Sequence, residues 1–438
     1  MMHDLLSQLK SQADADYIGE PISQLDHSLQ AASLAKAAGE SESLVLAALF
    51  HDIGHWCSAG EVSATQVGVV DHDQIGEQYL KQIGVAEKIS SLVGLHVQAK
   101  RYKAFSETGY EQKISPASLQ TLSLQGGPMN AAEAKTFESN PYFREALALR
   151  GYDEAAKKQS CKVAPVESYE SMLRRHLIEP LSKPKMTFFK KNGFVRIKSW
   201  FNDNEMARIE ESVRKMESWP EVPGKWMKYF EYASNQRTLC RIENFLEYEE
   251  VFSPYLLGDS FRLLLNQVMG APVVLFKEKI NFKQAGGQGF RAHQDAPAFR
   301  SFGQNFHLNL MLSIDQTSSD NGCLELMRSE RIRDLLPSEK DLTLSEDFEM
   351  KNEWISVETE PGDILVFDSY IPHKSAANLT KNSRRALYAT YNKACEGDWR
   401  EKYYEEKRRV FPPEAEREKG VTYDSNIFNL GNPIGVKI

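Results

Sequence analysis

The sequence predicts two domains of different classes, a helical N-terminal domain and a β-rich C-terminal domain. Apolar residues recur at helical spacing through the first part of the chain. Short runs of β-favouring residues, separated by turns, dominate the second part. The sequence pattern changes from helical to β-rich at residues 179–184, Glu-Pro-Leu-Ser-Lys-Pro. We interpret this segment as a linker. We therefore expect domains at residues 1–180 and 186–438.

The N-terminal domain is expected to be all-α. Helical spacing is clearest at 28–38 and 44–51, which Gly39 and its neighbours separate. Further helices are predicted at 73–83, 86–94, 131–137 and 142–158.

The C-terminal domain is expected to be an antiparallel β sandwich or open barrel with flanking helices. Strands are predicted at 273–282, 307–314, 323–327, 363–368 and 386–392. Turn sequences such as Pro-Gly-Asp at 361–363 separate them. Flanking helices are predicted at 203–218 and 259–269.

Composition narrows the class of protein. The net charge of −8 argues against nucleic-acid binding, which needs basic faces. There is no uncharged apolar run of about 18 residues, so no membrane span is expected. The five cysteines are scattered and form no CxxC pair. The start, MMHDLLSQLK, lacks an apolar signal core, so we expect a cytoplasmic enzyme. Homo-oligomerisation is left open.

Six of the ten histidines fall into two patterns with carboxylates, as expected for iron ligands. The first pattern lies in the N-terminal half: His27, His51, Asp52, His72, His96 and Asp153. An apolar helix delivers His51 and Asp52 together, and such neighbours serve two metals only if the carboxylate bridges them. Purely structural histidines are the alternative, but so many unpaired polar groups on apolar helices are unfavourable. His3 and His176 fit no pattern and are expected at the surface.

This ligand order and the run His-Asp-Ile-Gly-His at 51–55 resemble the HD-domain superfamily, most of whose members hydrolyse phosphate esters. Tyr17 and Glu20 before the first ligand, Lys100 after His96, and the run 149–153 resemble a narrower group, the phosphonate-degrading HD-domain oxygenases. Those enzymes use a mixed-valent di-iron centre and O2 to split the C–P bond of a 1-hydroxyphosphonate. The resemblance implies an HD-domain helical bundle over about residues 10–178.

The resemblance also implies roles. The six residues of the first pattern would hold two irons, with Asp52 bridging. Tyr17 would occupy an iron position in the resting state and leave when substrate arrives, and Glu20 would pair with a substrate ammonium. His55 would lie close by. Four side chains would grip the phosphonate: Lys100, Ser118, Thr121 and Arg150. Lys and Arg suit a dianion, although Lys100 and Arg150 are equally consistent with solvated surface charges.

The second pattern is His293-x-Asp295 with His373, 78 positions further on. It is typical of the facial triad of non-haem Fe(II) oxygenases, which leaves positions open for a keto acid and O2. The far carboxylate of a keto acid needs a cation, and Arg384 with Ser375 fits that need. Arg385 competes with Arg384, but alternate residues of a strand face opposite sides, so only one should point inward.

With the run 277–283, this pattern resembles the phytanoyl-CoA dioxygenase family over about residues 186–395. The resemblance implies a double-stranded β-helix (a jelly-roll or cupin-like fold) with one Fe(II) and 2-oxoglutarate near Asn281. Halogenating relatives have a small residue at Asp295, so hydroxylation is favoured. Several further positions are open or expected to be peripheral. We leave open whether Lys279 and Lys283 face solvent and whether Arg291 and Arg300 bind an anionic substrate. We expect His307 to pack among strands and the tail 399–419 to be a solvated helix or a surface arm.

Together the resemblances predict a bifunctional oxygenase acting on a small aminophosphonate. The C-terminal domain would hydroxylate C1 of 2-aminoethylphosphonate or an N-methylated analogue. The N-terminal domain would then cleave the C–P bond to give glycine or betaine and phosphate. The alternative is an HD-domain phosphohydrolase fused to a 2-oxoglutarate hydroxylase of a small metabolite. A third interpretation makes one domain a binding or regulatory module.

Overall fold

The structure is a computed structural model that divides into two compact units, Met1–Ile178 and Glu179–Ile438. It describes residues 2–11, 22–57, 64–65, 68–69, 71–159, 161–233, 236–423 and 427–430. Tyr17 and Glu20 lie outside the described residues. We describe each unit by itself.

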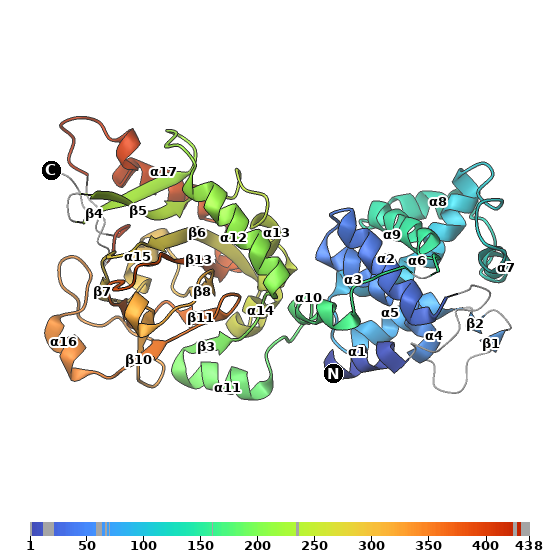
Figure 1. The fold of residues 1–438 in the computed structure, drawn as a ribbon, viewed down its shortest axis with the longest axis horizontal. Coiled ribbons are helices and arrows are strands. Elements are labelled where there is room, and N and C mark those ends of the chain that lie inside the picture. Colours follow the sequence, from blue (N-terminus) through green and yellow to red (C-terminus); the bar gives the residue numbers. More distant parts are fainter. Residues whose placement is uncertain are drawn as a thin grey trace. The chain divides into compact units, whose positions relative to one another are not determined.

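The N-terminal unit is helical, as predicted (Figure 1). Its helices are α1 (Met2–Ser11), α2 (Gln24–Ala37), α3 (Glu42–Phe50), α4 (Gly54–Cys57), α5 (His72–Gln82), α6 (Glu87–Ser106), α7 (Pro116–Leu124), α8 (Ala131–Glu138), α9 (Phe143–Ala155) and α10 (Glu170–Arg175), with a two-stranded sheet of β1 (Ala64–Thr65) and β2 (Gly68–Val69). Helix α3 is buried along its whole length and packs against α2, α6 and α9. Serine side chains cap the N-termini of α2, α3 and α7, where the first N–H groups have no partner within the helix. These buried helices form the scaffold on which the polar cluster described below is held.

The C-terminal unit contains two antiparallel sheets, the double-stranded β-helix that the sequence analysis predicted. The larger sheet has the order β3 (Phe194–Ile197), β11 (Ile364–Asp368), β8 (Leu308–Ser313), β13 (Arg384–Lys393), β6 (Val273–Lys283), β5 (Gln236–Glu243) and β4 (Met227–Ala233). The smaller has the order β10 (Trp354–Val357), β9 (Leu324–Met327), β12 (His373–Ser375) and β7 (Phe290–His293). Apolar side chains from both sheets, among them Leu326 and Phe367, pack into one buried cluster between them.

Helices cover the outer face of the larger sheet (Figure 1). The unit contains α11 (Lys183–Asn192), α12 (Asp203–Glu217), α13 (Ser253–Leu256), α14 (Asp259–Met269), α15 (Ala296–Phe299), α16 (Glu346–Lys351) and α17 (Arg400–Val410). Buried residues of α12 and α14, such as Ile209 and Leu264, form the main hydrophobic core with the sheet. Helix α11 begins inside the predicted linker, at Lys183. In the described residues no helix is both long and apolar enough to cross a membrane.

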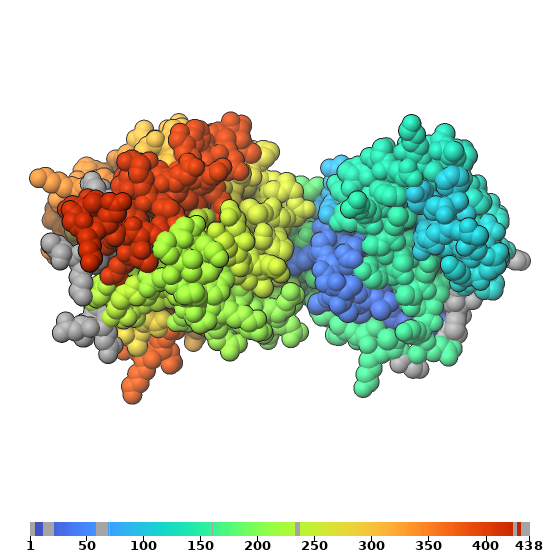
Figure 2. Space-filling view, turned by 90° about the horizontal axis from the view of Figure 1, so that it is seen from above, coloured from blue at the N-terminus to red at the C-terminus, as the bar shows by residue number. Residues whose placement is uncertain are grey.

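The expectation of a solvated tail after residue 399 was wrong. In Figure 2 the red segment that contains α17 packs against the green surface of the same unit. Tyr403, Tyr404 and Lys407 of α17 are buried. The Tyr404 hydroxyl donates to the backbone oxygen of Glu278 on β6 at 2.7 Å. One face of this charged helix is therefore part of the core.

The expectation of a surface position for His176 was also wrong. Its side chain is buried, and its Nδ1 lies 3.0 Å from the backbone oxygen of Met172 and 3.6 Å from a carboxylate oxygen of Glu42. The neighbouring Arg175 is buried as well and pairs with Glu42. The ion pair of Arg175 with Glu42, a residue far away in the sequence, therefore keeps Arg175 and His176 buried. The side chain of His3 lies outside the described part of the structure.

Candidate metal centres and their pockets

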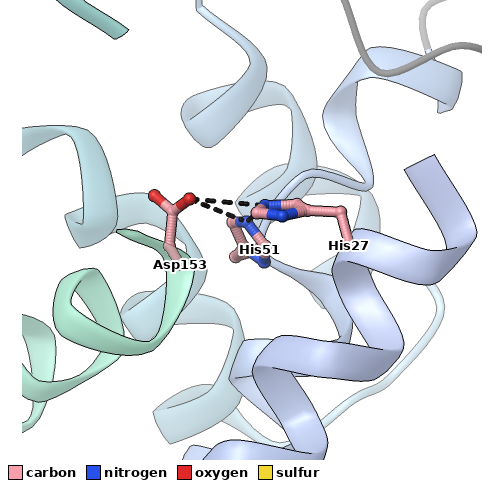
Figure 3. A group of neighbouring side chains, drawn as sticks. All are labelled: His27, His51 and Asp153. Carbon is pink, nitrogen blue, oxygen red and sulfur yellow. Dashed lines mark hydrogen bonds and ion pairs between the residues drawn. The ribbon is translucent and has the colours of Figure 1, made fainter. Parts of the chain in front are cut away.

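Six polar side chains converge in the N-terminal unit, and all are buried. They come from five places in the fold: α2 (His27), the end of α3 (His51 and Asp52), the start of α5 (His72), α6 (His96) and α9 (Asp153). Figure 3 shows His27 and His51 reaching toward Asp153 from separate elements. One Asp153 oxygen lies 3.3 Å from Nε2 of His27 and 3.8 Å from Nε2 of His51.

Asp52 lies between two pairs of histidines. Its Oδ2 is 3.3 Å from Nε2 of His51 and 3.6 Å from Nε2 of His27. Its Oδ1 is 3.4 Å from Nε2 of His72 and 3.8 Å from Nε2 of His96. Each carboxylate oxygen thus faces a different pair, an arrangement in which one carboxylate can bridge two metal ions.

The four histidines are anchored in the same way. Each Nδ1 lies between 2.7 and 3.0 Å from a backbone carbonyl oxygen. A carbonyl oxygen can only accept, so the neutral form of each ring carries its proton on Nδ1 and presents a lone pair at Nε2. The Nε2 atoms of His27 and His51 are 3.0 Å apart, and those of His72 and His96 are 2.9 Å apart. Two nitrogen ligands at right angles, each ~2.1 Å from one metal ion, would be about 3 Å apart, so each pair fits a metal ion.

The buried charges of the cluster also favour the binding of a cation. Burial by itself lowers the pKa of His51, but the carboxylates of Asp52 and Asp153 outweigh it and raise that pKa to about 9. Burial by itself raises the pKa of Asp52, yet His51 and His72 hold it well below its ordinary value. The nitrogen and carboxylate donors together suit a transition-metal ion.

His55 lies beside this cluster, but its ring carries the proton on the other nitrogen. The backbone N–H of Val69 donates to its Nδ1 at 3.3 Å, so its own proton is on Nε2. Its ring stacks on that of His72, with centroids 4.0 Å apart. Burial, reinforced by His72, lowers the pKa of His55 to about 3. A neutral His55 with Nε2 protonated is a hydrogen-bond donor rather than a metal ligand.

Cationic and hydroxyl side chains gather on one side of α7. Lys100 is buried, and its Nζ donates to Oγ1 of Thr121 at 2.9 Å. Ser118 lies one turn earlier and accepts from Nζ of Lys157 at 3.3 Å. Burial, together with Arg150, lowers the pKa of Lys100 to about 7. The structure thus brings Lys100, Ser118 and Thr121 together and adds Lys157.

Arg150 is buried rather than solvated. One of its Nη atoms donates to Asp153, and its Nε donates to Glu154 at 2.8 Å. Its Nη2 is buried and has no hydrogen-bond partner in the part of the chain that the structure describes. Arg150 therefore orients the metal-facing Asp153 and retains a donor for an anion.

The second site lies where β7 and β12 pair in the small sheet, with His293 and His373 directly opposite each other. Nε2 of His293 is 3.8 Å from one oxygen of Asp295, and Nε2 of His373 is 3.7 Å from the other. Both Nδ1 atoms lie against backbone oxygens, at 2.7 and 3.1 Å. The two Nε2 lone pairs therefore face Asp295, as a metal triad requires. The carboxamide of Asn309 donates to Asp295 at 2.9 Å.

Arg384 and Ser375 line the pocket of this triad, together with Asn281. Nε of Arg384 and the side-chain oxygen of Asn281 are buried without a hydrogen-bond partner among the described residues. Arg385 instead pairs with Asp315, on the other side of the strand. Lys283 is not solvent-facing: it is buried and donates to Ser375 at 2.8 Å. Nε of Arg384 thus offers an unpartnered cationic donor in the pocket, while its Nη2 donates to the backbone oxygen of Gly322.

The flanking arginines do not join the site. Arg291 and Arg300 are exposed, and Arg291 pairs with Asp341. His307 is buried among Phe276 and Phe299, consistent with a packing role, and lies 2.6 Å from the side-chain oxygen of Gln304. Neither arginine is therefore positioned to bind an anion at the triad.

The jelly roll, its triad and its keto-acid pocket define the C-terminal unit as an Fe(II)- and 2-oxoglutarate-dependent dioxygenase domain. The chain belongs to the phytanoyl-CoA dioxygenase family, whose model matches residues 189–386, and a second model, the HD domain, matches residues 25–125.

Several characterised proteins are similar to this chain. A 2-aminoethylphosphonate dioxygenase of an uncultured bacterium is 44% identical over 257 residues, 58% of this chain and 98% of that protein. A glycine-betaine-forming 1-hydroxy-2-(trimethylamino)ethylphosphonate dioxygenase of Leisingera caerulea is 36% identical over 163 residues, 37% of this chain and 83% of that protein. A hydroxymethylphosphonate dioxygenase of Gimesia maris is 34% identical over 168 residues, 38% of this chain and 83% of that protein.

Sequence reasoning missed three residues at these sites. Lys157 lies just beyond the end of α9, where helical spacing from Asp153 no longer applies, so no sequence signal selects it. Asn309 and Lys277 lie on strands, at positions whose side chains face the triad. The sequence around each residue does not show which side of its strand faces the triad.

Proposed function

We propose that this chain performs two consecutive oxidations of an aminophosphonate. In the C-terminal unit, the C1–H bond of the phosphonate, O2 and 2-oxoglutarate give the C1 hydroxyl, succinate and CO2. In the N-terminal unit, the 1-hydroxyphosphonate and a second O2 give a carboxylic acid and phosphate. From 2-aminoethylphosphonate the products are glycine and phosphate. From the trimethylated analogue they are glycine betaine and phosphate.

One observation carries the proposal: each unit has its own set of converging metal donors, and the relatives are named for successive compounds. The relative matched over 257 residues is named for an aminophosphonate without the C1 hydroxyl. The relatives matched over 163 and 168 residues are named for 1-hydroxyphosphonates, and those lengths fit the N-terminal unit. The product of the first reaction is the substrate class of the second.

In the N-terminal unit, two irons would be held by the six clustered side chains, with Asp52 between them. Iron there supplies the redox chemistry with O2. Lys100, Thr121 and Ser118 bind the phosphonate, together with the free Nη2 of Arg150. The neutral His55 donates its Nε2 proton as a hydrogen bond near the substrate hydroxyl. Tyr17 and Glu20 would take the resting-state and ammonium-binding roles that the resemblance implies.

In the C-terminal unit, the triad of His293, Asp295 and His373 holds one Fe(II). Arg384 and Ser375 take the far carboxylate of 2-oxoglutarate, and Asn281 lies beside it. Asp295 keeps three protein ligands on the metal, which favours hydroxylation over halogenation.

The competing function is hydrolysis of a phosphate ester by the N-terminal unit, since the HD-domain match at residues 25–125 is shared with hydrolases. Hydrolysis needs no O2, whereas oxidative cleavage of the C–P bond does. The two functions can therefore be distinguished by whether phosphate release requires O2.

The test uses purified full-length protein with Fe(II), 2-oxoglutarate, ascorbate and O2, followed by phosphorus NMR. Phosphate release from 2-aminoethylphosphonate is expected. His373→Ala should abolish that release and retain release from the 1-hydroxy compound, whereas Asp52→Ala should let the 1-hydroxy compound accumulate. Phosphate release that survives Asp52→Ala, or that proceeds without O2, would contradict the proposal.

A further inference from the structure

The pocket of the C-terminal triad has a second cationic region besides Arg384. Lys277 and Lys279 of β6 both line the pocket, as does Asn281 further along the same strand. The residue between the two lysines, Glu278, faces the opposite side and is bound by Arg400 of α17. The alternation of β6 thus sends two lysine side chains toward the triad.

The two cationic regions lie at different points along the strand. Arg384 of β13 is opposite Lys283, whereas Tyr388 and Thr390 are opposite Lys279 and Lys277. Lys283 lies four positions after Lys279 on β6, which at ~3.3 Å per residue is about 13 Å along the backbone. Arg384 and the lysine pair are therefore carried at different points of the strand pair, although the Arg384 side chain also reaches Tyr388.

The lysine pair is not neutralised by the protein. Among the described residues, no carboxylate forms an ion pair with Nζ of Lys277 or Lys279, and no acceptor forms a hydrogen bond with either. The nitrogens lie over the rings of Phe299 and Tyr388, at 4.6 and 5.3 Å. By contrast, Lys374 in the same pocket is paired with Glu349 at 3.2 Å.

Their electrostatic surroundings favour an incoming anion. Burial lowers the pKa of both lysines, and the only acidic side chain that lines the pocket in the described structure is Asp295, already a triad member. A dianion bound between the two ammonium groups would favour their charged forms, against the burial that lowers their pKa, and would satisfy both. Among the described residues, the pocket lining holds no second carboxylate that could recognise a substrate ammonium.

We propose that Lys277 and Lys279 together bind the phosphonate dianion of the substrate in the C-terminal unit, while Arg384 binds 2-oxoglutarate. This inference rests on the proposed function and names the substrate residues of its first step. Because C1 is bonded directly to phosphorus, holding the phosphonate beside Asp295 brings C1 toward the metal. The pocket then recognises the anionic end of the substrate and is tolerant of its amine.

The test follows the visible charge-transfer band of the ferrous 2-oxoglutarate complex, which reports on this site alone. Full-length protein without O2 is titrated with 2-aminoethylphosphonate, with methylphosphonate, which lacks the amine, and with β-alanine, which lacks the phosphonate. The variants are Lys277→Gln, Lys279→Gln and the double variant. Lys351→Gln is the matched control, because Lys351 is exposed and paired only with Asp347.

Each single variant should raise the Kd of both phosphonates about tenfold or more, since a hydrogen bond to a charged group has that effect. The control should leave the Kd unchanged, β-alanine should not shift the band, and 2-oxoglutarate should bind all variants like the wild type. Unchanged phosphonate affinity in both glutamine variants would overturn the inference. So would an equal loss of 2-oxoglutarate affinity, which would assign the lysines to the keto acid.

Two further measurements distinguish a structural role of Lys279 from a failure of the proposed function. Lys279→Arg keeps the charge and should retain the shift; loss of 2-oxoglutarate binding in both the Gln and the Arg variants would give Lys279 a purely structural role. If wild-type consumption of 2-oxoglutarate does not depend on phosphonate, the proposed function fails. A phosphonate-induced shift that the lysine variants lose would still support the lysine assignment in that case.

Discussion

The side-chain amide of Asn309 donates a 2.9 Å hydrogen bond to Oδ2 of Asp295. Thr390 donates in turn to the side-chain oxygen of Asn309 at 2.7 Å, from the neighbouring strand β13. Asn309 and Thr390 are directly opposite each other in the β8–β13 register. This chain of hydrogen bonds fixes the rotation of the only carboxylate in the triad, which lies on a loop rather than on a strand.

We therefore expect Asn309→Ala to weaken Fe(II) binding at the C-terminal site by about 10- to 100-fold, as loss of a partner behind a metal ligand does. Thr390→Val removes only the second bond and should have a smaller effect in the same direction. Anaerobic Fe(II) titration, read by the 2-oxoglutarate charge-transfer band, measures both. Wild-type affinity in Asn309→Ala would show that Asp295 needs no orienting partner.

Arg384 and Arg385 provide a matched pair of adjacent residues that face opposite sides of β13. Arg384→Gln should raise the KM for 2-oxoglutarate about 10- to 100-fold, because a charged hydrogen bond to a carboxylate is worth ~1.5–3 kcal/mol. Arg385→Gln breaks a partly exposed pair with Asp315 and should leave this KM unchanged. Steady-state kinetics with 2-oxoglutarate varied at saturating phosphonate distinguishes the two. Equal effects would mean that Arg384 does not contact the keto acid.

Metal removal should destabilise the N-terminal unit. Its six donors converge in the folded state only, so a metal at a hundredfold excess over its Kd stabilises the fold by ~2.7 kcal/mol. We expect chelation to lower the thermal unfolding temperature of this unit in the wild type and to have little effect in Asp52→Ala. Asp26→Asn, on an exposed turn of the same region, is the control and should respond to chelator like the wild type. A chelator effect of equal size in Asp52→Ala would argue against a bridging role.

The buried pair of Lys407 and Glu243 predicts the acid sensitivity of the C-terminal unit. Nζ of Lys407 lies 2.6 Å from both oxygens of Glu243, and both side chains are buried. Glu243 keeps Arg241 at 3.0 Å as a second buried partner, so Lys407→Met should cost less than the ~3–5 kcal/mol of a fully unpaired buried charge in the free energy of unfolding. Lys351→Met, on an exposed helix, should cost little.

The pH dependence follows from the carboxylate. Burial by itself raises the pKa of Glu243, but Lys407 and Arg241 outweigh it and lower that pKa from 4.5 to about 2. The unfolded state binds the proton more readily, so the ionised Glu243 contributes its full stability above the unfolded value of 4.5 and loses it as pH falls through about 2. Burial outweighs the attraction of Glu243 and lowers the pKa of Lys407 to about 7, so both partners are charged only below that pH. In Lys407→Met the pKa of Glu243 should rise, and stability should begin to fall at higher pH. Urea unfolding between about pH 7 and about pH 3 checks this; identical pH profiles would contradict it.

The elements with strong periodicity could be predicted from the sequence, because the spacing of apolar residues reports which face is buried. Helix α12 is an example, with Met206, Ile209, Val213 and Met216 on its buried face. Helix α3 and strand β11 were predicted instead from continuous apolar runs. The tail 399–419 was expected to be a solvated helix or a surface arm, and the buried face of α17 was not predicted. The mean composition of α17 is strongly charged, and only Tyr403, Tyr404 and Lys407, at spacings of one to four residues, mark the buried face.

The grouping of the metal-facing residues could be predicted from the sequence, because histidine and aspartate on apolar segments are unusual. The hydrogen bonds and ion pairs that support the sites could not be predicted. Asn309 reaches Asp295, Lys283 reaches Ser375 and Arg175 reaches Glu42 across long sequence separations. Each depends on strand register or helix packing that only the folded chain sets.

The anchoring of His27 has a consequence for biosynthesis. Its Nδ1 is held by the backbone oxygen of Ala156, 129 positions later, just after Asp153. A nascent chain that has emerged only as far as α6 already contains five of the six donors, but His27 has neither its anchor nor its carboxylate neighbour. Iron bound before that point would lack Asp153 and the His27 anchor, so we expect the proposed iron site to be complete only after Ala156 has emerged.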